Sequence, residues 1–231
     1  MGRAPIIGRA TRCPPIPARL AKALGGRLPG AGQRIGLLGG SFNPAHAGHR
    51  AISATALRRL RLDAVWWLVA PQNPLKTKAG TAPLRKRVAA AKAIARHPRI
   101  VVSPLEETLG TVYTADTIAA LVRRFPRVRF VWLMGADNLQ QVSRWRRWPE
   151  IFTTVAVAIF DRPTYSLRAL AAPAARRFAR QRIGERTAKR LAERKPPAWV
   201  FIRHRLNPQS STRIRAAKPD PTRLKRMRQP R

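Results

Sequence analysis

The 231-residue sequence contains one cysteine, few acidic residues and no long apolar run. The lone cysteine, Cys13, excludes an intramolecular disulfide framework and a zinc site built from cysteines. No stretch approaches the ~20 apolar residues that a membrane-spanning helix requires. The longest apolar runs, residues 64–70 and 151–160, are each typical of a buried strand. We therefore expect a soluble, cytoplasmic protein with no membrane partner.

The scarcity of acidic residues gives the chain a large positive charge. Lys and Arg number 47 against 10 Asp and Glu, so the formal net charge is +37. Two explanations stay open: a basic surface that reflects biased residue usage, and a polyanionic partner whose phosphates the cations attract. Because the charge is spread along the chain, it indicates only an affinity for phosphate. Nucleic acid stays open as a partner, and the sequence does not indicate an oligomeric state.

The rest of the composition is that of a folded domain. A hydrophobic content of 45% is normal for a globular protein and excludes a wholly disordered chain. Residues 1–33 contain no acidic residue and no durable periodicity, so we predict a disordered basic extension there. Residues 218–231 form a second basic tail, whose prolines argue against a helix. A single domain is predicted over residues 34–217.

Strand-like and helix-like runs alternate within this domain. Strands are predicted over residues 34–38, 64–69, 100–102, 128–134, 155–160 and 199–202, and helices over residues 47–60, 84–96 and 115–124. Such alternation implies βαβ units, hence an α/β fold with a parallel sheet and right-handed crossovers. In these sheets ligands bind beyond the carboxyl ends of the strands. The loops after residues 38, 70, 102 and 134 are therefore the candidate functional loops.

The loop after the first strand carries the strongest signal, and it reads Gly-Gly-Ser-Phe-Asn-Pro-Ala-His-Ala-Gly-His from Gly39 to His49. Two glycines let the backbone approach a ligand closely, and a helix beginning near His46 directs free N–H groups at it. His46 and His49 share one face of that helix, so both imidazoles could donate hydrogen bonds to phosphate oxygens. Neither a Walker loop nor a dinucleotide fingerprint is present. A zinc site is disfavoured, because only His97 and His204 remain as further histidines.

Two later segments carry polar or aromatic residues near expected strand ends. The loop Pro-Gln-Asn-Pro-Leu-Lys ends at Lys76, which is either a solvated cation or a phosphate contact. The segment Thr-Val-Tyr-Thr-Ala-Asp-Thr contains Tyr113 and Thr114 just before a predicted helix. Thr114 is interpreted first as the N-cap of that helix, and Tyr113 could simply pack in the core.

Three further motifs follow. Gly135 and Asp137 end a buried strand, where a carboxylate either accepts bonds from ribose hydroxyls or caps a helix. Trp145 and Trp148 lie three residues apart, a spacing typical of core aromatic residues, and we assign Trp148 that role. The run Gln-Ser-Ser-Thr-Arg-Ile-Arg, residues 209–215, exposes hydroxyls and N–H groups at a helix start, and the guanidinium of Arg215 could bind an anion there.

With these motifs in this order, residues 34–217 resemble the nucleotidylyltransferases that carry a His-x-Gly-His signature on a Rossmann-like, doubly wound parallel sheet. More narrowly, they are similar to the bacterial nicotinate-nucleotide adenylyltransferases. The resemblance implies catalytic roles for His46 and His49. It implies ATP contacts at Gly39, Gly40, Ser41, Phe42, Gly48, Gly135, Asp137, Ser210, Ser211, Thr212 and Arg215, and mononucleotide contacts at Asn43, Lys76, Tyr113, Thr114 and Trp145.

The resemblance also implies the reaction: adenylyl transfer from ATP to nicotinate mononucleotide, giving deamido-NAD and pyrophosphate. ATP is then a substrate, and Mg²⁺ is expected to bind chiefly through its phosphates, with no dedicated protein site. Gln209 stands where the family often has a hydrophobic residue, and Asn43 where it often has Asp. The alternatives are another pyridine-nucleotide or phosphopantetheine adenylyltransferase, or a basic RNA- or ribosome-binding protein on the same fold.

Overall fold

A seven-stranded, wholly parallel sheet forms the centre of the protein, which we describe from a computed structural model. The structure describes residues 16–71, 81–162, 166–204, 211 and 214. The strands are β1 (Arg34–Gly40), β2 (Ala64–Val69), β3 (Ile100–Ser103), β4 (Arg129–Gly135), β5 (Ala156–Phe160), β6 (Arg182–Ile183) and β7 (Trp199–Ile202). The α-helices are α1 (Ala18–Ala23), α2 (Ala47–Arg59), α3 (Leu84–Ala95), α4 (Leu105–Leu109), α5 (Thr114–Arg124), α6 (Ala136–Gln141), α7 (Trp148–Thr154), α8 (Ser166–Leu170) and α9 (Pro173–Arg177).

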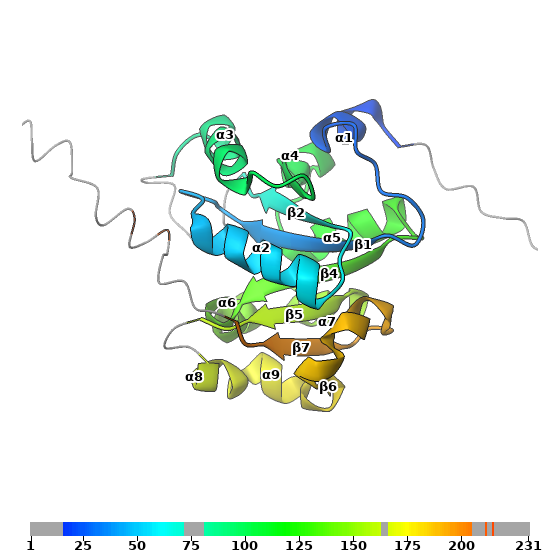
Figure 1. The fold of residues 1–231 in the computed structure, drawn as a ribbon, viewed down its shortest axis with the longest axis vertical. Helices are drawn as coiled ribbons and strands as arrows, with labels where there is room; N and C mark the ends of the chain where they lie inside the picture. The colour runs from blue at the N-terminus through cyan, green and yellow to red at the C-terminus, as the bar shows by residue number, and fades with distance from the viewer. Residues whose placement is uncertain (1–15, 72–80, 163–165, 205–210, 212–213, 215–231) are drawn as a thin grey trace, which may run out of the picture.

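The strand order is β3-β2-β1-β4-β5-β7-β6, so the chain builds outward from β1 in one direction and later in the other. The reversal lies between β1 and β4, which pair in parallel from Arg34 opposite Arg129 to Leu38 opposite Leu133. In a doubly wound sheet the two loops that leave such a pair diverge and open a crevice for ligands. Figure 1 shows the carboxyl ends of these strands at one end of the sheet, with the N-terminus of α2 beside them. The predicted Rossmann-like α/β fold is confirmed.

Helices cover both faces of the sheet, and each face has its own hydrophobic core. One core joins α1, α4, α5, α6 and α7 to side chains such as Leu37 and Trp132. The other joins α2, α3 and the 3₁₀ helix η3 (Glu185–Glu193) to side chains such as Leu38 and Leu133. Adjacent strand residues alternate between the two cores because successive side chains point to opposite faces of a sheet. Both faces are buried, which explains why these strands are continuous apolar runs in the sequence.

The extension predicted for residues 1–33 is wrong for its second half. α1 forms within it, and Leu20 and Leu24 are buried in the first core. The hydroxyl of Ser103, at the end of β3, also donates to the carbonyl oxygen of Ala23 at 2.7 Å. The helix is only one and a half turns long, too short for its periodicity to be recognised in a basic, proline-rich context. Residues 1–15 and the tail 218–231 lie outside the described residues.

Most predicted elements are confirmed, with ends shifted by a residue or two, but the apolar run 151–160 is not one strand. Its first part completes α7, Val155 ends that helix, and only Ala156–Phe160 forms β5. Periodicity cannot separate a buried helix from a buried strand in so short a run. Across the described ranges, every helix is too short or too polar to span a lipid bilayer.

Candidate active site

The loop that follows β1 leaves the carboxyl end of a strand, as the sequence predicts, and the structure places it where the strand order reverses. β1 ends at Gly39 and Gly40, and a Cβ on Gly39 would collide with the indole of Trp132 from β4. Only glycine therefore lets the two strands keep this packing at the mouth of the crevice. The loop then passes through Phe42, whose φ of +45° is unusual for a residue with a side chain.

His46 and His49 are locked into the start of α2 by a reciprocal pair of hydrogen bonds. The Nδ1 atom of His46 accepts from the N–H of Gly48 at 3.1 Å, and Nδ1 of His49 accepts from the N–H of His46 at 3.2 Å. His46 is the N-cap, so this is a capping box made by two imidazoles. The ring centroids lie 4.0 Å apart. Because each Nδ1 accepts, each neutral ring carries its proton on Nε2, which leaves two Nε2–H donors for a ligand.

Both imidazoles are held neutral. Burial, followed by the charge of Arg162, lowers the pKa of His46 to about 4, with Asp137 acting in the opposite direction. Burial, the neighbouring His46 and Arg162 lower the pKa of His49 to about 3. At pH 7 the pair therefore donates hydrogen bonds without carrying charge, and the positive charge in this region comes from arginine.

His49 is fixed on its other side by aromatic rings. Phe42 lies 4.7 Å from His49 and stacks on Trp67 at 5.1 Å, measured between ring centroids. The indole N–H of Trp67 donates to the hydroxyl of Ser53, which in turn donates to the carbonyl oxygen of His49. Phe42 is 1% exposed and belongs to the second core, so its side chain supports His49 from inside the protein, and its contact with ATP stays a prediction.

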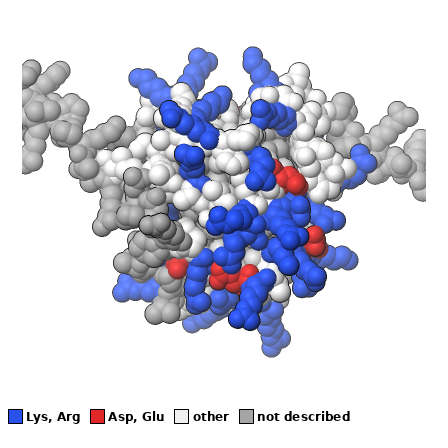
Figure 2. Space-filling model, viewed as in Figure 1, with Lys and Arg blue, Asp and Glu red and all other residues white. Residues whose placement is uncertain are grey.

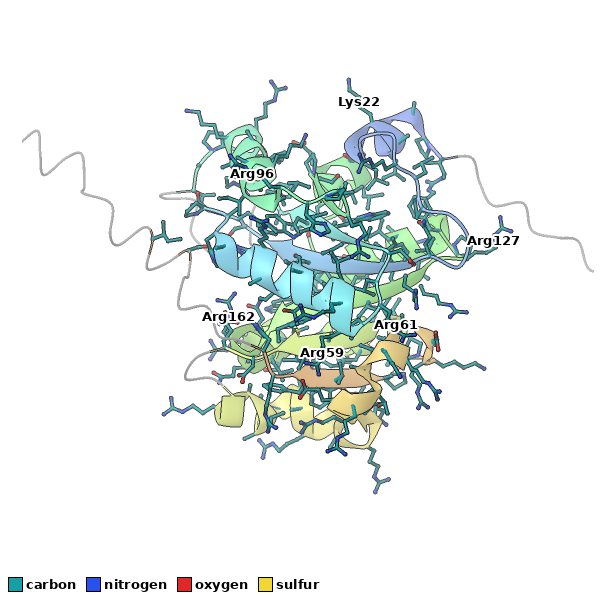
Figure 3. The ribbon with its side chains drawn as sticks, viewed as in Figure 1. Lys22, Arg59, Arg61, Arg96, Arg127 and Arg162 are labelled. Carbon is teal, nitrogen blue, oxygen red and sulfur yellow. The ribbon has the colours of Figure 1, made fainter. Side chains whose placement is uncertain are left out.

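Asp137 and Arg162 meet over Gly135 at the end of β4. The Nε atom of Arg162 lies 3.3 Å from Oδ1 of Asp137, and a Cβ on Gly135 would collide with both atoms. Asp137 lies in the first turn of α6 and makes no capping bond there, so the capping interpretation is wrong. Figure 3 shows Arg162 beyond the carboxyl end of β5, toward the N-terminal end of α2. Arg162 was not among the residues predicted from the sequence, although its position two residues after a buried strand was an available signal.

The Ser-Ser-Thr motif reaches the first loop. The hydroxyl of Ser211 donates to the carbonyl oxygen of Pro44 at 2.9 Å, across 167 residues of sequence. Because the hydroxyl proton is used in this bond, Ser211 fixes the position of the loop between β1 and α2. The predicted contacts Lys76, Ser210, Thr212 and Arg215 lie outside the described residues.

Two of the predicted mononucleotide contacts, Tyr113 and Thr114, lie at the N-terminus of α5. The half-buried ring of Tyr113 is stacked 4.7 Å from the guanidinium of Arg146, the neighbour of Trp145. Tyr113 is the N-cap and Thr114 the first helical residue, so the interpretation of Thr114 as N-cap is wrong. Trp145 is half-buried and packs against the first core.

Arg147 joins this segment to α5 and α7. It donates to Asp116 at 2.7 Å and to both carboxylate oxygens of Glu150. Trp148, assigned to the core, packs edge-on against Phe152 and Phe178.

Asn43, a predicted mononucleotide contact, lies in the loop after β1. Its Oδ1 accepts a hydrogen bond from the N–H of Ala82 at 3.3 Å.

The charged groups that act on the histidines are the guanidinium of Arg162 and the carboxylate of Asp137. Among the described residues no group of three or more His, Cys, Asp or Glu side chains comes close enough together to bind a metal ion. Figure 2 shows Lys and Arg gathered at the top of this face and over its lower centre and right, with few acidic side chains among them. The neutral N–H donors at the start of α2 and the guanidinium of Arg162 suit an anionic ligand.

A helix N-terminus with two imidazoles at a sheet switch point defines a class of phosphate-handling α/β proteins, and sequence comparison agrees. The family model described as cytidylyltransferase-like matches residues 37–217, so the chain belongs to that family.

Similar proteins within this family have a more specific name than the family itself. The chain is 57% identical to the probable nicotinate-nucleotide adenylyltransferase of Bradyrhizobium sp. (strain ORS 278) over 182 residues, which are 79% of this chain and 95% of the relative. It is 56% identical to a protein of the same name from Methylorubrum extorquens, again over 79% of this chain and 98% of the relative. The resemblance inferred from the motifs is confirmed.

A solved structure shares the fold. The nicotinic acid mononucleotide adenylyltransferase of Plasmodium falciparum, complexed with NaAD, superposes with a TM-score of 0.62 at 16% sequence identity. The match covers 84% of this chain and 89% of that chain. At this identity the likeness concerns the arrangement of the sheet and helices.

Proposed function

We propose that the chain transfers the adenylyl group of ATP to nicotinate mononucleotide, releasing pyrophosphate and forming deamido-NAD. The observation that carries the proposal is the capping box of His46 and His49, which leaves two Nε2–H donors at a helix N-terminus. The names of relatives at 56–57% identity support the choice of substrates.

The chemistry needs no protein base. The phosphate of the mononucleotide is already anionic at pH 7, and one of its oxygens attacks the α-phosphorus of ATP. A new P–O bond forms there while the bond from the α-phosphorus to the bridging oxygen breaks, and pyrophosphate leaves. The protein contributes alignment and donors aimed at the developing negative charge.

We assign His49 to the charge that develops at the α-phosphate and His46 to the neighbouring phosphate oxygens. The backbone of Gly39 and Gly40, with Ser41, lines the triphosphate, and Arg215 holds the departing pyrophosphate. Arg162 adds a guanidinium at the edge of this site, where its charge already acts on both imidazoles. The carboxylate of its partner Asp137 suits a ribose hydroxyl, which would donate to it.

The described donor set suits Mg²⁺ that enters with the nucleotide. Asp137 is paired with Arg162, and no acidic cluster competes for the ion among the described residues. Bound Mg²⁺ would neutralise charge on the phosphates, and it would be held mainly by them.

The test is pyrophosphate release from ATP and Mg²⁺ with nicotinate mononucleotide, nicotinamide mononucleotide or phosphopantetheine as acceptor. We expect release with the nicotinate form, lost in His49→Ala. Preference for another acceptor would keep adenylyl transfer and overturn the assigned roles of Tyr113, Thr114 and Trp145. Silence with all three acceptors would overturn the proposal and favour an RNA-binding function.

A further inference from the structure

Arg87, in the first turn of α3, is a buried cation without a carboxylate partner. Its side chain is 3% exposed, and it is the one Arg or Lys that is buried among the described residues. Burial lowers its pKa from the usual arginine range. Taking a guanidinium out of water costs several kcal/mol unless its N–H groups find acceptors, so its presence calls for an explanation beyond packing.

The guanidinium donates four hydrogen bonds, all to backbone carbonyl oxygens. Nη1 donates to Ser41 at 2.6 Å and to Ala70 at 2.7 Å. Nη2 donates to Pro71 at 2.7 Å, and Nε donates to Ala82 at 2.8 Å. These carbonyls belong to three segments that are distant in sequence: the loop after β1, the segment after β2, and the residues before α3.

Two further bonds cross the same junction. Oδ1 of Asn43, in the loop after β1, accepts from the N–H of Ala82 at 3.3 Å. Where β1 and β2 end, the N–H of Ala70 donates to the carbonyl oxygen of Gly40 at 3.0 Å. Arg87 lies between these two links and bonds to the segments on both sides. The loops after β1 and β2 and the start of α3 are therefore held together around one guanidinium.

The arrangement suits arginine and no other residue. A planar guanidinium offers five N–H groups in a rigid fork, so one side chain can hold three backbone segments at fixed angles. The three N–H donors of a lysine radiate from one atom and cannot span them in this way. An apolar side chain would fill the volume and leave four carbonyl oxygens without these donors.

We propose that Arg87 is a positioning residue, which fixes the loop after β1 against Ala70 and Pro71 at the end of β2 and thereby sets the distance between the two substrates. Four of the five guanidinium N–H groups of Arg87 already bond to backbone carbonyl oxygens, so Arg87 acts through Ser41, Ala70 and Pro71 and not on a substrate directly. The inference rests on the proposed function, because the sequence that follows Ala70 and Pro71 contains Lys76, a predicted mononucleotide contact. Adenylyl transfer depends on in-line approach, and a misplacement of about 1 Å costs on the order of 100-fold in rate.

The test compares Arg87→Lys and Arg87→Met with Arg27→Met. Arg27 is a matched control because its Nη1 donates to the carbonyl oxygen of Pro98 at 2.8 Å, away from the loops after β1 and β2. We measure kcat well below each melting temperature, and the dissociation constant for ATP without acceptor. For Arg87→Met we expect kcat to fall about 100-fold while ATP affinity changes less than about threefold, since the capping box stays intact.

Arg87→Lys keeps the charge and decides the question if Arg87→Met does not fold. We expect its kcat to fall at least about tenfold, with a near-wild-type ATP dissociation constant. Arg27→Met should keep its kcat even if its melting temperature falls. Wild-type kcat in folded Arg87→Lys would overturn the proposal, since the charge alone would then suffice.

A second readout is independent of activity. Amide hydrogen exchange in residues 40–43 and at Ala70 should be faster in Arg87→Lys than in the wild type, and unchanged in Arg27→Met. Equal exchange at these amides in Arg87→Lys and the wild type would overturn the positioning role. A wild-type protein that releases no pyrophosphate would instead overturn the proposed function, and the exchange result would still stand.

Discussion

The hydroxyl of Ser211 donates a 2.9 Å hydrogen bond to the carbonyl oxygen of Pro44, joining the last motif of the domain to its first. Through this bond and the capping box, the loop between β1 and α2 is held from two directions. The loop that carries the histidines is therefore built by segments from both ends of the domain.

Replacing Ser211 with Ala removes that bond. We expect KM for ATP to rise about three- to tenfold, because Ser211 is itself a predicted ATP contact and one neutral hydrogen bond contributes about 1 kcal/mol. Ser103→Ala is the matched control, since its hydroxyl also donates to a backbone carbonyl, that of Ala23, at 2.7 Å. Steady-state kinetics and melting temperatures of both variants check the prediction, and equal KM values would refute it.

His49→Ala should lower kcat by about 100- to 1,000-fold, the usual cost of losing one donor to a developing oxyanion. His97→Ala is the control: its Nδ1 accepts from the N–H of Arg99, just before β3, and we expect unchanged kcat. The measurement is the initial rate of pyrophosphate release at saturating substrates. A His49→Ala variant with more than half the wild-type kcat would remove His49 from the mechanism.

The lowered pKa values of His46 and His49 make folding sensitive to acid. The unfolded chain binds protons at these rings below the ordinary pKa of 6.5, whereas the folded rings resist protonation down to about 4 and about 3. Stability is therefore lost as the pH falls from 6.5 toward 4, by up to about 2 kcal/mol per histidine at pH 5. Urea unfolding at pH 7 and pH 5 should show a smaller loss in the His46→Gln, His49→Gln double variant. An equal loss in both proteins would contradict these pKa directions.

Glu106 should change the pH dependence of folding stability in the opposite direction. It is 5% exposed in α4, and burial raises its pKa from 4.5 to about 7. The unfolded chain releases this proton above pH 4.5 and the folded chain near pH 7, so stability is lost as the pH rises through that window. Glu106→Gln should therefore stabilise the protein by about 1–3 kcal/mol at pH 8, and the gain should vanish near pH 4.5. Urea unfolding at both pH values measures it, and a pH-independent difference would show that ionisation is not the cause.

Gly135→Ala should disrupt the nucleotide side of the site, because its Cβ would displace the Asp137 carboxylate and the Arg162 guanidinium. We expect overpacking to cost about 1–3 kcal/mol of stability and KM for ATP to rise. Gly184→Ala is the matched control, since a Cβ there meets nothing within 4 Å. Thermal unfolding and ATP kinetics compare the two, and matching values would show that the Asp137–Arg162 pair tolerates displacement.

Local sequence patterns determined a large part of this protein. The strands of the parallel sheet are buried on both faces, so they stand out as apolar runs, and the amphipathic helices between them imply the right-handed crossovers. Short motifs with fixed chemistry, such as the two histidines at a helix start, were also readable. Their loop falls at the carboxyl end of β1, as predicted.

Tertiary structure alone decided which distant groups act together. α1 is too short to be recognised from its own sequence, and it is stabilised because Leu20 and Leu24 are buried in the first core. Arg162 and Arg87 look like any other arginine in a chain with 47 basic residues. Arg162 is distinguished by its ion pair with Asp137 over Gly135, and Arg87 by its bonds to four backbone carbonyls. These partners come from other strands and loops. A sequence pattern records the preference of each segment for helix or strand, whereas burial and partner choice arise only when the segments pack.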